Sequence, residues 1–540
     1  MTRTSRYLLL AILLFPAAAV ADDAGLPDAA TLEAEGAIIG AILLERRNVF
    51  DLADPEEDNA LFRLANRLHI VTREKVIRQQ LLFREGEPYS ERLVEESARI
   101  LRRNDYFYDA RIRAVRYENG VVDLQVTTRD LWTLMPGFSI SRKGGENRAR
   151  VSLSETNLLG GGARIKLAYV DDVDRESTSL EYADRNLGDS WRSLLLRYSD
   201  NSDGEILQVA LAQPFYALDT RNAWGLSFYD GEFETRFYAL GEEVAEYRSA
   251  QRTTEAWIGR SSGLVDGWVR RLSVGLTRDE RRFAQALEPT LPALLPEDRE
   301  LTYPWVGIEW VEDDFETSSN RDQIERTEDF FMGTRIGASL GYASADAGSD
   351  RDAFVFRAAA SRGFGSMGSS ALLLGSNLSG RVESGTVVNA LWQVDSRYYR
   401  QLSERSLVFT TLAGAWGRRL DLDNPLQLGG DNGLRGYPLR YQVGEQRLLL
   451  SAEYRYFTDW YPFRLARVGG AVFADAGRTW GANPAGGGSL GWLTDVGIGL
   501  RFAPTRASGR EVIHLDIAFP LDGDPTIDDV QLLLESKRSF

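Results

Sequence analysis

The chain has 540 residues, and its 79 acidic side chains outnumber its 63 basic ones, which gives a formal net charge of −16. This balance argues against nucleic acid as a partner, because phosphate backbones are bound by basic surfaces. No cysteine is present, so a disulfide framework and thiol chemistry are excluded. Fifty glycines and 57 aromatic residues (12 Trp, 21 Tyr, 24 Phe) with 17 prolines are typical of a β-rich protein.

The N-terminus has the pattern of a secretory signal. Arg3 and Arg6 precede the apolar run Tyr7–Phe15, and Ala19-Val20-Ala21 forms a small-x-small cleavage site. The run is too short for a membrane anchor, which must cross about 30 Å of hydrocarbon. We therefore expect a signal peptide over residues 1–21, removed after Ala21, and a short tail over residues 22–35. The rest of the chain has no apolar run of the roughly 20 residues that a membrane helix needs.

Residues 36–130 are expected to form a small α+β domain. A strand is predicted over Ile38–Phe50, followed by an acidic loop. Two helices follow, one from about Thr72 to just before Gly86 and one from Ser90, each with an N-cap candidate and one apolar face. The size of the segment, roughly 95 residues, suffices for an independent domain.

The domain ends in a predicted β-hairpin. Apolar and polar residues alternate over Ala110–Ala114 and again over Val122–Val126. Asn119-Gly120 lies between them, and this dipeptide supplies the positive φ angles of a type I′ turn. The predicted order of elements is therefore β-α-α-β-β.

Residues 131–540 show no convincing helix and many alternating strands. Three examples are Ala163–Tyr169, Leu448–Tyr456 and Ile513–Phe519, each with one face compatible with lipid. A soluble β-sandwich or solenoid alternates too, but the secretory signal and the terminal Phe540 favour a closed transmembrane barrel. At roughly ten residues per strand plus turns and loops, about sixteen strands are expected. Long polar stretches over 284–300, 343–352 and 481–489 are predicted to be extracellular loops.

A glycine-rich segment is the sharpest feature of this region: Leu428-Gly429-Gly430-Asp431-Asn432-Gly433-Leu434-Arg435-Gly436-Tyr437. Four glycines around one arginine do not suit a barrel strand, but they suit a loop folded tightly into a confined space. The guanidinium of Arg435 would need a carboxylate there, since an unpaired buried charge is costly. Asp475 and Glu453, on neighbouring predicted strands, are the candidates. The face that carries Asp475 is otherwise nearly devoid of bulk, so a loop can lie against it.

These residues resemble the signature of the BamA/TamA-type superfamily of outer-membrane assembly and translocation proteins, whose barrels are also found in bacterial surface antigens. The resemblance implies that residues 36–130 are a periplasmic POTRA domain and that the barrel lies in the outer membrane. It also implies that an arginine at the tip of the sixth extracellular loop is clamped to a Phe-x-Asp-x-Gly motif on the wall. The residues that it assigns to this clamp are Gly433, Arg435, Gly436, Tyr437, Glu453, Phe473, Asp475 and Gly477.

Two further segments, Asn157–Gly162 and Leu515–Leu521, also look like barrel segments of this superfamily, whereas other features depart from it. General assembly members carry several POTRA domains, and this chain has room for one. Two-partner secretion members carry two and a plug helix, neither of which is evident. Arg538 stands near the C-terminus where an apolar residue is more usual.

Motifs of enzymes and cofactors find little support, so neither a cofactor, a metal nor catalysis is expected. Gly363–Gly368 fits G-x-G-x-x-G literally, but no βαβ unit surrounds it. The only histidines, His69 and His514, lie in different domains. A lipase-type nucleophile elbow is not expected, and no spaced calcium-binding run occurs.

Function is expected from the resemblance: the barrel inserts polypeptide into the outer membrane or moves it across. The partners would be outer-membrane lipid and an unfolded or extended client, held at a sheet edge of the POTRA domain by β-augmentation. A spacer domain that binds nothing is the alternative for that domain. A passive pore or surface antigen is the alternative for the whole chain. The clamp itself could be dynamic or purely structural.

Overall fold

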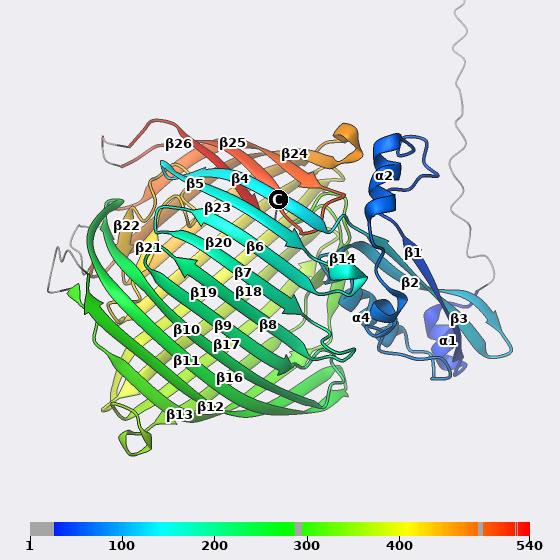
Figure 1. Cartoon of the computed structure of the whole chain (residues 1–540), viewed down its shortest axis with the longest axis horizontal. Helices are drawn as coiled ribbons and strands as arrows, with labels where there is room; N and C mark the ends of the chain where they lie inside the picture. The colour runs from blue at the N-terminus through cyan, green and yellow to red at the C-terminus, as the bar shows by residue number, and fades with distance from the viewer. Residues whose placement is uncertain (1–25, 287–293, 484–489, 524, 526, 540) are drawn as a thin grey trace, which may run out of the picture.

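The computed structural model describes residues 26–540, apart from 287–293, 484–489, 524, 526 and 540. The expected signal peptide lies outside the described residues. The described part forms a small α+β domain that sits at one end of a large barrel (Figure 1).

The small domain packs three of its four helices on one three-stranded sheet. The sheet order is β1-β3-β2, with β1 parallel and β2 antiparallel to β3. Apolar side chains of the sheet and of the helices α3 and α4 form one core. The elements are α1 (Ala29–Ala34), β1 (Ile38–Arg47), α2 (Ala60–Leu68), α3 (Glu74–Arg78), α4 (Glu91–Arg102), β2 (Phe107–Glu118) and β3 (Val121–Asp130).

The predicted hairpin is present, and the helices differ from expectation. Asn119 and Gly120 have φ angles of 52° and 78°, which a type I′ turn requires. The helix expected up to Gly86 covers only Glu74–Arg78, and α2 was not predicted. Asn59 caps α2 by accepting a hydrogen bond from the Phe62 amide at 2.9 Å, which is a signal that the sequence contained.

The barrel is closed and antiparallel, with twenty strands rather than the sixteen expected. The expectation allowed too much chain for loops, because many connections are tight turns such as Asn201–Gly204 and Leu240–Gly241. The first ten strands are β4 (Leu134–Lys143), β5 (Glu146–Glu155), β6 (Arg164–Asp171), β7 (Glu176–Asp184), β8 (Ser193–Asn201), β9 (Gly204–Gln213), β10 (Asn222–Ala239), β11 (Glu242–Val265), β12 (Trp268–Gln285) and β13 (Arg299–Glu312). The last ten are β16 (Arg335–Ala343), β17 (Ala353–Ser366), β18 (Ser370–Glu383), β19 (Thr386–Ser403), β20 (Ser406–Arg418), β23 (Gln446–Phe457), β24 (Ala466–Trp480), β25 (Leu493–Pro504), β26 (Val512–Pro520) and β27 (Gln531–Lys537).

Apolar side chains point outward along the barrel strands, as the alternation predicted. On β6, Ile165, Leu167 and Tyr169 are exposed, while Ala168 between them is buried on the inner side. This is the arrangement that a wall in contact with lipid requires. Among the described residues, no helix is long and apolar enough to span a membrane.

Two connections turn into the barrel instead of remaining outside it. The first, residues 419–445 between β20 and β23, contains β21 (Leu426–Leu428) and β22 (Gln442–Gly444). The second, residues 313–334 between β13 and β16, contains β14 (Phe315–Ser318) and β15 (Glu328–Phe331). Both bury side chains against the inner wall of the C-terminal strands.

The three predicted loops have different outcomes. Residues 343–352 contain the short helix η3 (Ala345–Ala347) between β16 and β17. The stretch 284–300 starts in β12 and ends in β13, and its residues 287–293 lie outside the described residues. Residues 484–489 of the third stretch also lie outside them. Two other short helices are η1 (Leu158–Gly160) and η4 (Pro462–Arg464).

Candidate functional site

The loop 419–445 brings its glycine-rich tip inside the barrel. Gly433 has a φ angle of +125°, which glycine adopts without strain. A Cβ atom on Gly436 would lie 2.7 Å from the Cβ atom of Asp495, so only glycine lets the backbone approach β25 so closely. The amide of Gly436 uses this approach to donate a hydrogen bond to Asp495 Oδ2 at 3.0 Å.

Arg435 meets both of the carboxylates expected for it. Its Nε and Nη2 donate to Asp475 at 2.7 and 2.8 Å, and its Nη1 donates to Glu453 at 2.7 Å. Nη2 also donates to Ser451 Oγ at 3.1 Å. The Arg435 side chain is 6% exposed and that of Asp475 is fully buried, so this is a desolvated, bidentate pair.

Apolar residues of the wall complete the seat for the tip. The guanidinium of Arg435 lies 3.4 Å from the ring centroid of Phe473. Gly477 leaves space on β24 that Leu428 and Leu434 of the loop fill. The structure therefore brings Arg435, Glu453, Phe473, Asp475 and Gly477 together.

Tyr437 is the last of the predicted loop residues. Its side chain is buried and stacks obliquely on Tyr441, with ring centroids 5.9 Å apart. Its hydroxyl donates a hydrogen bond to the Thr494 carbonyl at 2.8 Å. Tyr437 thus joins the loop to the start of β25 rather than to the acids around Arg435.

The buried charge network is larger than the sequence suggested. Arg501 pairs with Asp516, Arg455 donates to Glu453 at 2.8 Å, and Asp516 lies 3.7 Å from Arg435. These additional residues lie on β23, β25 and β26. Inward-facing charges on strands with an otherwise small or apolar inner face were the signal that could have identified them. Three arginines and three acids thus compensate one another out of contact with solvent.

A second contact joins the loop to the N-terminal strands. Arg440 donates two hydrogen bonds to the carboxylate of Asp174, at 2.7 and 2.5 Å, in the turn between β6 and β7. Burial tends to raise the pKa of Asp174, but the hydrogen bonds and charge of Arg440 more than offset it, so that pKa is lowered. Neither residue was predicted, because 266 residues separate them.

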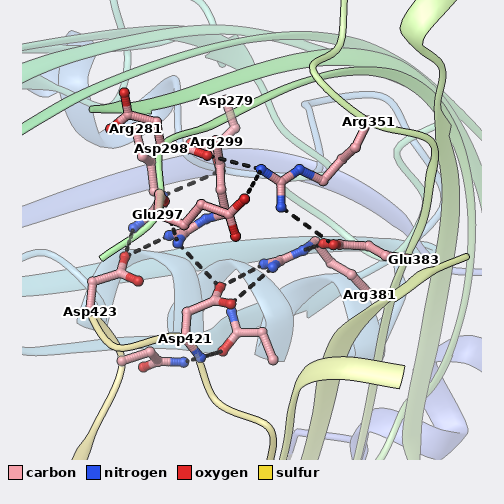
Figure 2. Close-up of polar contacts among 12 residues, drawn as sticks. Asp279, Arg281, Glu297, Asp298, Arg299, Arg351, Arg381, Glu383, Asp421 and Asp423 are labelled. Carbon is pink, nitrogen blue, oxygen red and sulfur yellow. Dashed lines mark hydrogen bonds and ion pairs between the residues drawn. The ribbon is translucent and has the colours of Figure 1, made fainter. Parts of the chain in front are cut away.

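A third contact holds the beginning of the loop. Figure 2 shows Asp421 and Asp423 facing a cluster of arginines from β12, β13 and β18. Arg381 donates to both oxygens of Asp421 at 2.8 and 3.0 Å, and Arg299 donates to Asp423 at 2.6 Å. The loop is therefore attached at its beginning, its tip and its end.

The hairpin segment 313–334 lies on the inner wall at the other end of the barrel. Ile324, Phe330 and Met332 pack on inward residues of β19, β20 and β23–β26. Arg455, which contacts the network around Arg435, donates to the Arg321 carbonyl at 2.9 Å. On its other side, Arg326 donates to the Phe107 carbonyl of the small domain at 2.6 Å. This hairpin thus connects the small domain with the buried charge network.

The contact between the first and last strands is the weakest in the wall. In the described register, β27 and β4 pair at one position only, Leu534 with Arg142. A cavity of about 590 Å³ opens beside it, lined by residues of β4, β5, β26 and β27 and by Arg440 of the loop. We call this junction the seam. Arg435 holds the loop to strands on one side of the seam, and Arg440 holds it to the other side.

The loop 419–445 was expected to be the sixth extracellular loop, and its position in the strand order differs from that. Connections distant from the small domain follow β4, β6, β8, β10, β12, β16, β18 and β20. The loop 419–445 is therefore the eighth on that side, not the sixth. Five strands follow it before the seam.

A comparison with known protein families finds a match within the small domain. The family model described as "POTRA: Surface antigen variable number repeat" matches residues 69–130. The chain carries a POTRA domain. With the closed barrel behind it, this match supports the BamA/TamA-type assignment made from the sequence. No curated protein matches the chain.

The solved structures that are similar to it include the following three. BamA from Haemophilus ducreyi, in a form lacking POTRA domains 1–3, has 12% identity and a TM-score of 0.39, and the match covers 93% of this chain and 84% of that one. CdiB from Acinetobacter baumannii has 11% identity, a TM-score of 0.46, and coverage of 93% and 73%. CdiB from Escherichia coli has 14% identity, a TM-score of 0.45, and coverage of 92% and 76%.

Proposed function

We propose that this protein inserts polypeptide into the outer membrane or moves it across, with the barrel in the outer membrane and the POTRA domain in the periplasm. The observation that carries the proposal is the seam. There, β4 and β27 are joined by one pair of residues, whereas other neighbouring strands, such as β10 and β11, pair along their length. Opening this junction breaks few backbone hydrogen bonds. A client strand can then pair with the exposed edges of β4 and β27.

The loop 419–445 supports this proposal, because it crosses the seam like a strap. Arg435 on one side and Arg440 on the other keep the two walls together through side chains. In this proposal the clamp predicted from Arg435 and Asp475 sets the working conformation of the barrel. Glu453, Phe473, Gly433, Gly436, Tyr437 and Gly477 shape the seat that the loop occupies.

Client capture is assigned to the free edge of the POTRA sheet. Among the described strands, none pairs with the second edge of β2. Near its start this edge is covered, because Arg102 donates to the Ala110 carbonyl at 3.0 Å. The stretch from Arg111 to Glu118 is thus the part of the edge that an extended client can join.

A passive pore, the alternative expected from the sequence, fits the contacts less well. The loop 419–445 fills space inside the barrel from one end, and the hairpin 313–334 does so from the other. Each packs several buried side chains on the inner wall. Both segments narrow the lumen and so restrict conduction through it, whereas opening of the seam requires neither to leave fully.

A disulfide across the seam tests the proposal. The chain has no cysteine, so Leu534→Cys with Arg142→Cys creates one unique pair at the only paired position of the seam. The matched control, Leu226→Cys with Ala256→Cys, joins paired residues of β10 and β11. We expect oxidation of the seam pair, but not of the control, to stop client crosslinking at the barrel and client delivery in cells. A reductant should restore both.

A photo-crosslinker in place of Arg113, on the free edge of β2, identifies the client for this assay. A crosslinker in place of Ala53, which is also exposed, serves as its control. Client traffic that continues through an oxidised seam at an unchanged rate would contradict the proposal.

A further inference from the structure

Helix α2 of the POTRA domain turns an apolar face away from the domain core. Leu61, Leu64 and Leu68 are 67%, 49% and 63% exposed, and their spacing places them on one side of the helix. Arg63 and Arg67 lie outside this face. The only buried apolar anchor of the helix is Phe62, which stacks on Phe50 with ring centroids 3.9 Å apart. A two-sided helix of this kind is the pattern of a segment that lies in a membrane interface.

The helix is fixed to the rim of the barrel. Arg506, in the turn between β25 and β26, is buried, donates to the Val49 carbonyl at 3.1 Å and pairs with Glu57. Trp132, just before β4, donates its amide proton to the Arg506 carbonyl at 2.7 Å. These contacts place α2 beside the strands that form the seam, as Figure 1 also shows near the end of β24.

The apolar face of α2 continues onto the rim. An apolar groove of about 360 Å³ runs between Leu64 and Leu68 of the helix and Trp132 and Leu465 of the barrel. The neighbouring turn carries Trp460 and Phe463, which are 61% and 86% exposed. Phe463 has a φ angle of +54°, a conformation that a bulky residue rarely adopts, yet its ring faces outward. Aromatic side chains at the rim of a membrane barrel are typical of the lipid interface.

We infer that α2 is an interfacial helix, whose leucine face lies in the periplasmic leaflet of the outer membrane beside the seam. This inference rests on the proposed orientation of the barrel and goes beyond the proposed function. Continuity with the lipid-facing wall selects lipid as the occupant, because Leu465, which lines the groove, belongs to the same turn as Trp460 and Phe463. The helix then anchors the POTRA domain to the bilayer at the point where a client would enter the membrane.

Fluorescence quenching by lipid tests the inference. Because the chain has no cysteine, Leu64→Cys in the full-length protein can carry a single environment-sensitive dye. The protein is reconstituted in vesicles of phosphatidylethanolamine and phosphatidylglycerol that contain a lipid with a nitroxide on its acyl chain. We expect at least threefold stronger quenching at Leu64→Cys than at Arg63→Cys, on the polar side of the same helix.

Glu118→Cys, near the β2–β3 turn that projects away from the barrel in Figure 1, reports whether the whole domain lies on the bilayer. All three residues are exposed, so the substitutions leave the core intact, and heat-modifiability checks the barrel. Equal quenching at Leu64→Cys and Arg63→Cys, strong quenching at Glu118→Cys, or none at any position overturns the inference. Each result is independent of client traffic, so it does not depend on the outcome of the seam disulfide.

Discussion

The wall of this barrel is built in two different ways. On one side, β10 pairs with β11 along its whole length from Asn222 to Ala239, and β11 and β12 continue the same ladder. At the seam, the seven-residue strand β27 meets β4 at one pair of residues. Backbone hydrogen bonds close the first region, whereas side chains of the loop 419–445 hold the second. The difference shows where the barrel can open at small cost.

The buried charges are concentrated on the side of the barrel that leads to the seam. Arg455 and Arg501 lie on the strands between the loop and the seam, and so do the acids that pair with them and with Arg435. A network of this kind contributes little net stability compared with an apolar core, but it fixes one arrangement, because any misplaced charge is left unpaired. The five strands that follow the loop therefore form a rigid panel whose free edge is β27.

Hydrogen exchange of the reconstituted protein measures how easily the seam and the rest of the wall open. We expect the backbone amides of β27 to exchange about a hundredfold faster, or more, than those in the middle of β11, since amides are protected in proportion to the free energy of local opening. Mass spectrometry of peptides from the two strands gives both rates in one experiment. Equal protection of the two strands would remove the distinction between seam and wall.

Arg435→Ala should have the largest effect of any single substitution. It leaves Asp475 and Glu453 buried with one fewer partner, and such a loss costs about 3–5 kcal/mol. Urea unfolding followed by heat-modifiability measures the loss, and client delivery should fall with it. Arg418→Ala, at an exposed position just before the loop, is the control and should change stability by about 0.5 kcal/mol or less.

Swapping the two charged residues distinguishes the energy of their ion pair from the energy of their packing. Arg435→Asp combined with Asp475→Arg keeps one cation beside Glu453 and Asp516, so the double variant should recover part of the stability that each single variant loses. If the double variant is as unstable as the sum of the singles, the residues are not energetic partners.

The sequence contained enough information for the tip of the loop and its seat. Glycine at positions 433 and 436 is needed for a positive φ and for a close approach, and both needs leave a mark in the sequence. Alternation likewise assigned the inner face of β24 correctly, including Asp475. Asp516 and Arg501 were within reach of the same reasoning, since both are charges on inward-facing positions.

Strand number and long-range contacts could not be predicted in this way. Whether a polar stretch becomes a tight turn or a long loop depends on the neighbouring strands, so four strands were missed. Arg440 and Asp174 are joined only after the barrel closes, and so are Arg506 and Glu57, which are 449 residues apart. No local pattern marks either pair.

Removal of the hairpin 313–334 distinguishes the seam from the lumen as the route of a client. Replacement of residues 315–332 with a glycine-serine linker of equal length removes the side chains that pack on the inner wall, among them Phe330 and Met332, and should raise ion conductance in planar bilayers severalfold. In the same variant, the oxidised Leu534–Arg142 cysteine pair should still stop client delivery. Delivery that survives oxidation once the hairpin is gone would assign the route to the lumen.

Arg440→Ala should have the smallest effect, and it acts on the seam alone. The pair with Asp174 is partly exposed, with side-chain exposures of 16% and 30%, so its loss should cost about 1 kcal/mol. The pKa of Asp174 is lowered from its ordinary value of 3.8, so the contribution of the pair is present above that pH and is lost as the pH falls through the lowered pKa. In Arg440→Ala at neutral pH, amide hydrogen exchange in β27 should therefore become severalfold faster, while that in β11 stays unchanged. If both strands respond alike, Arg440 stabilises the whole barrel and the loop does not act as a strap across the seam.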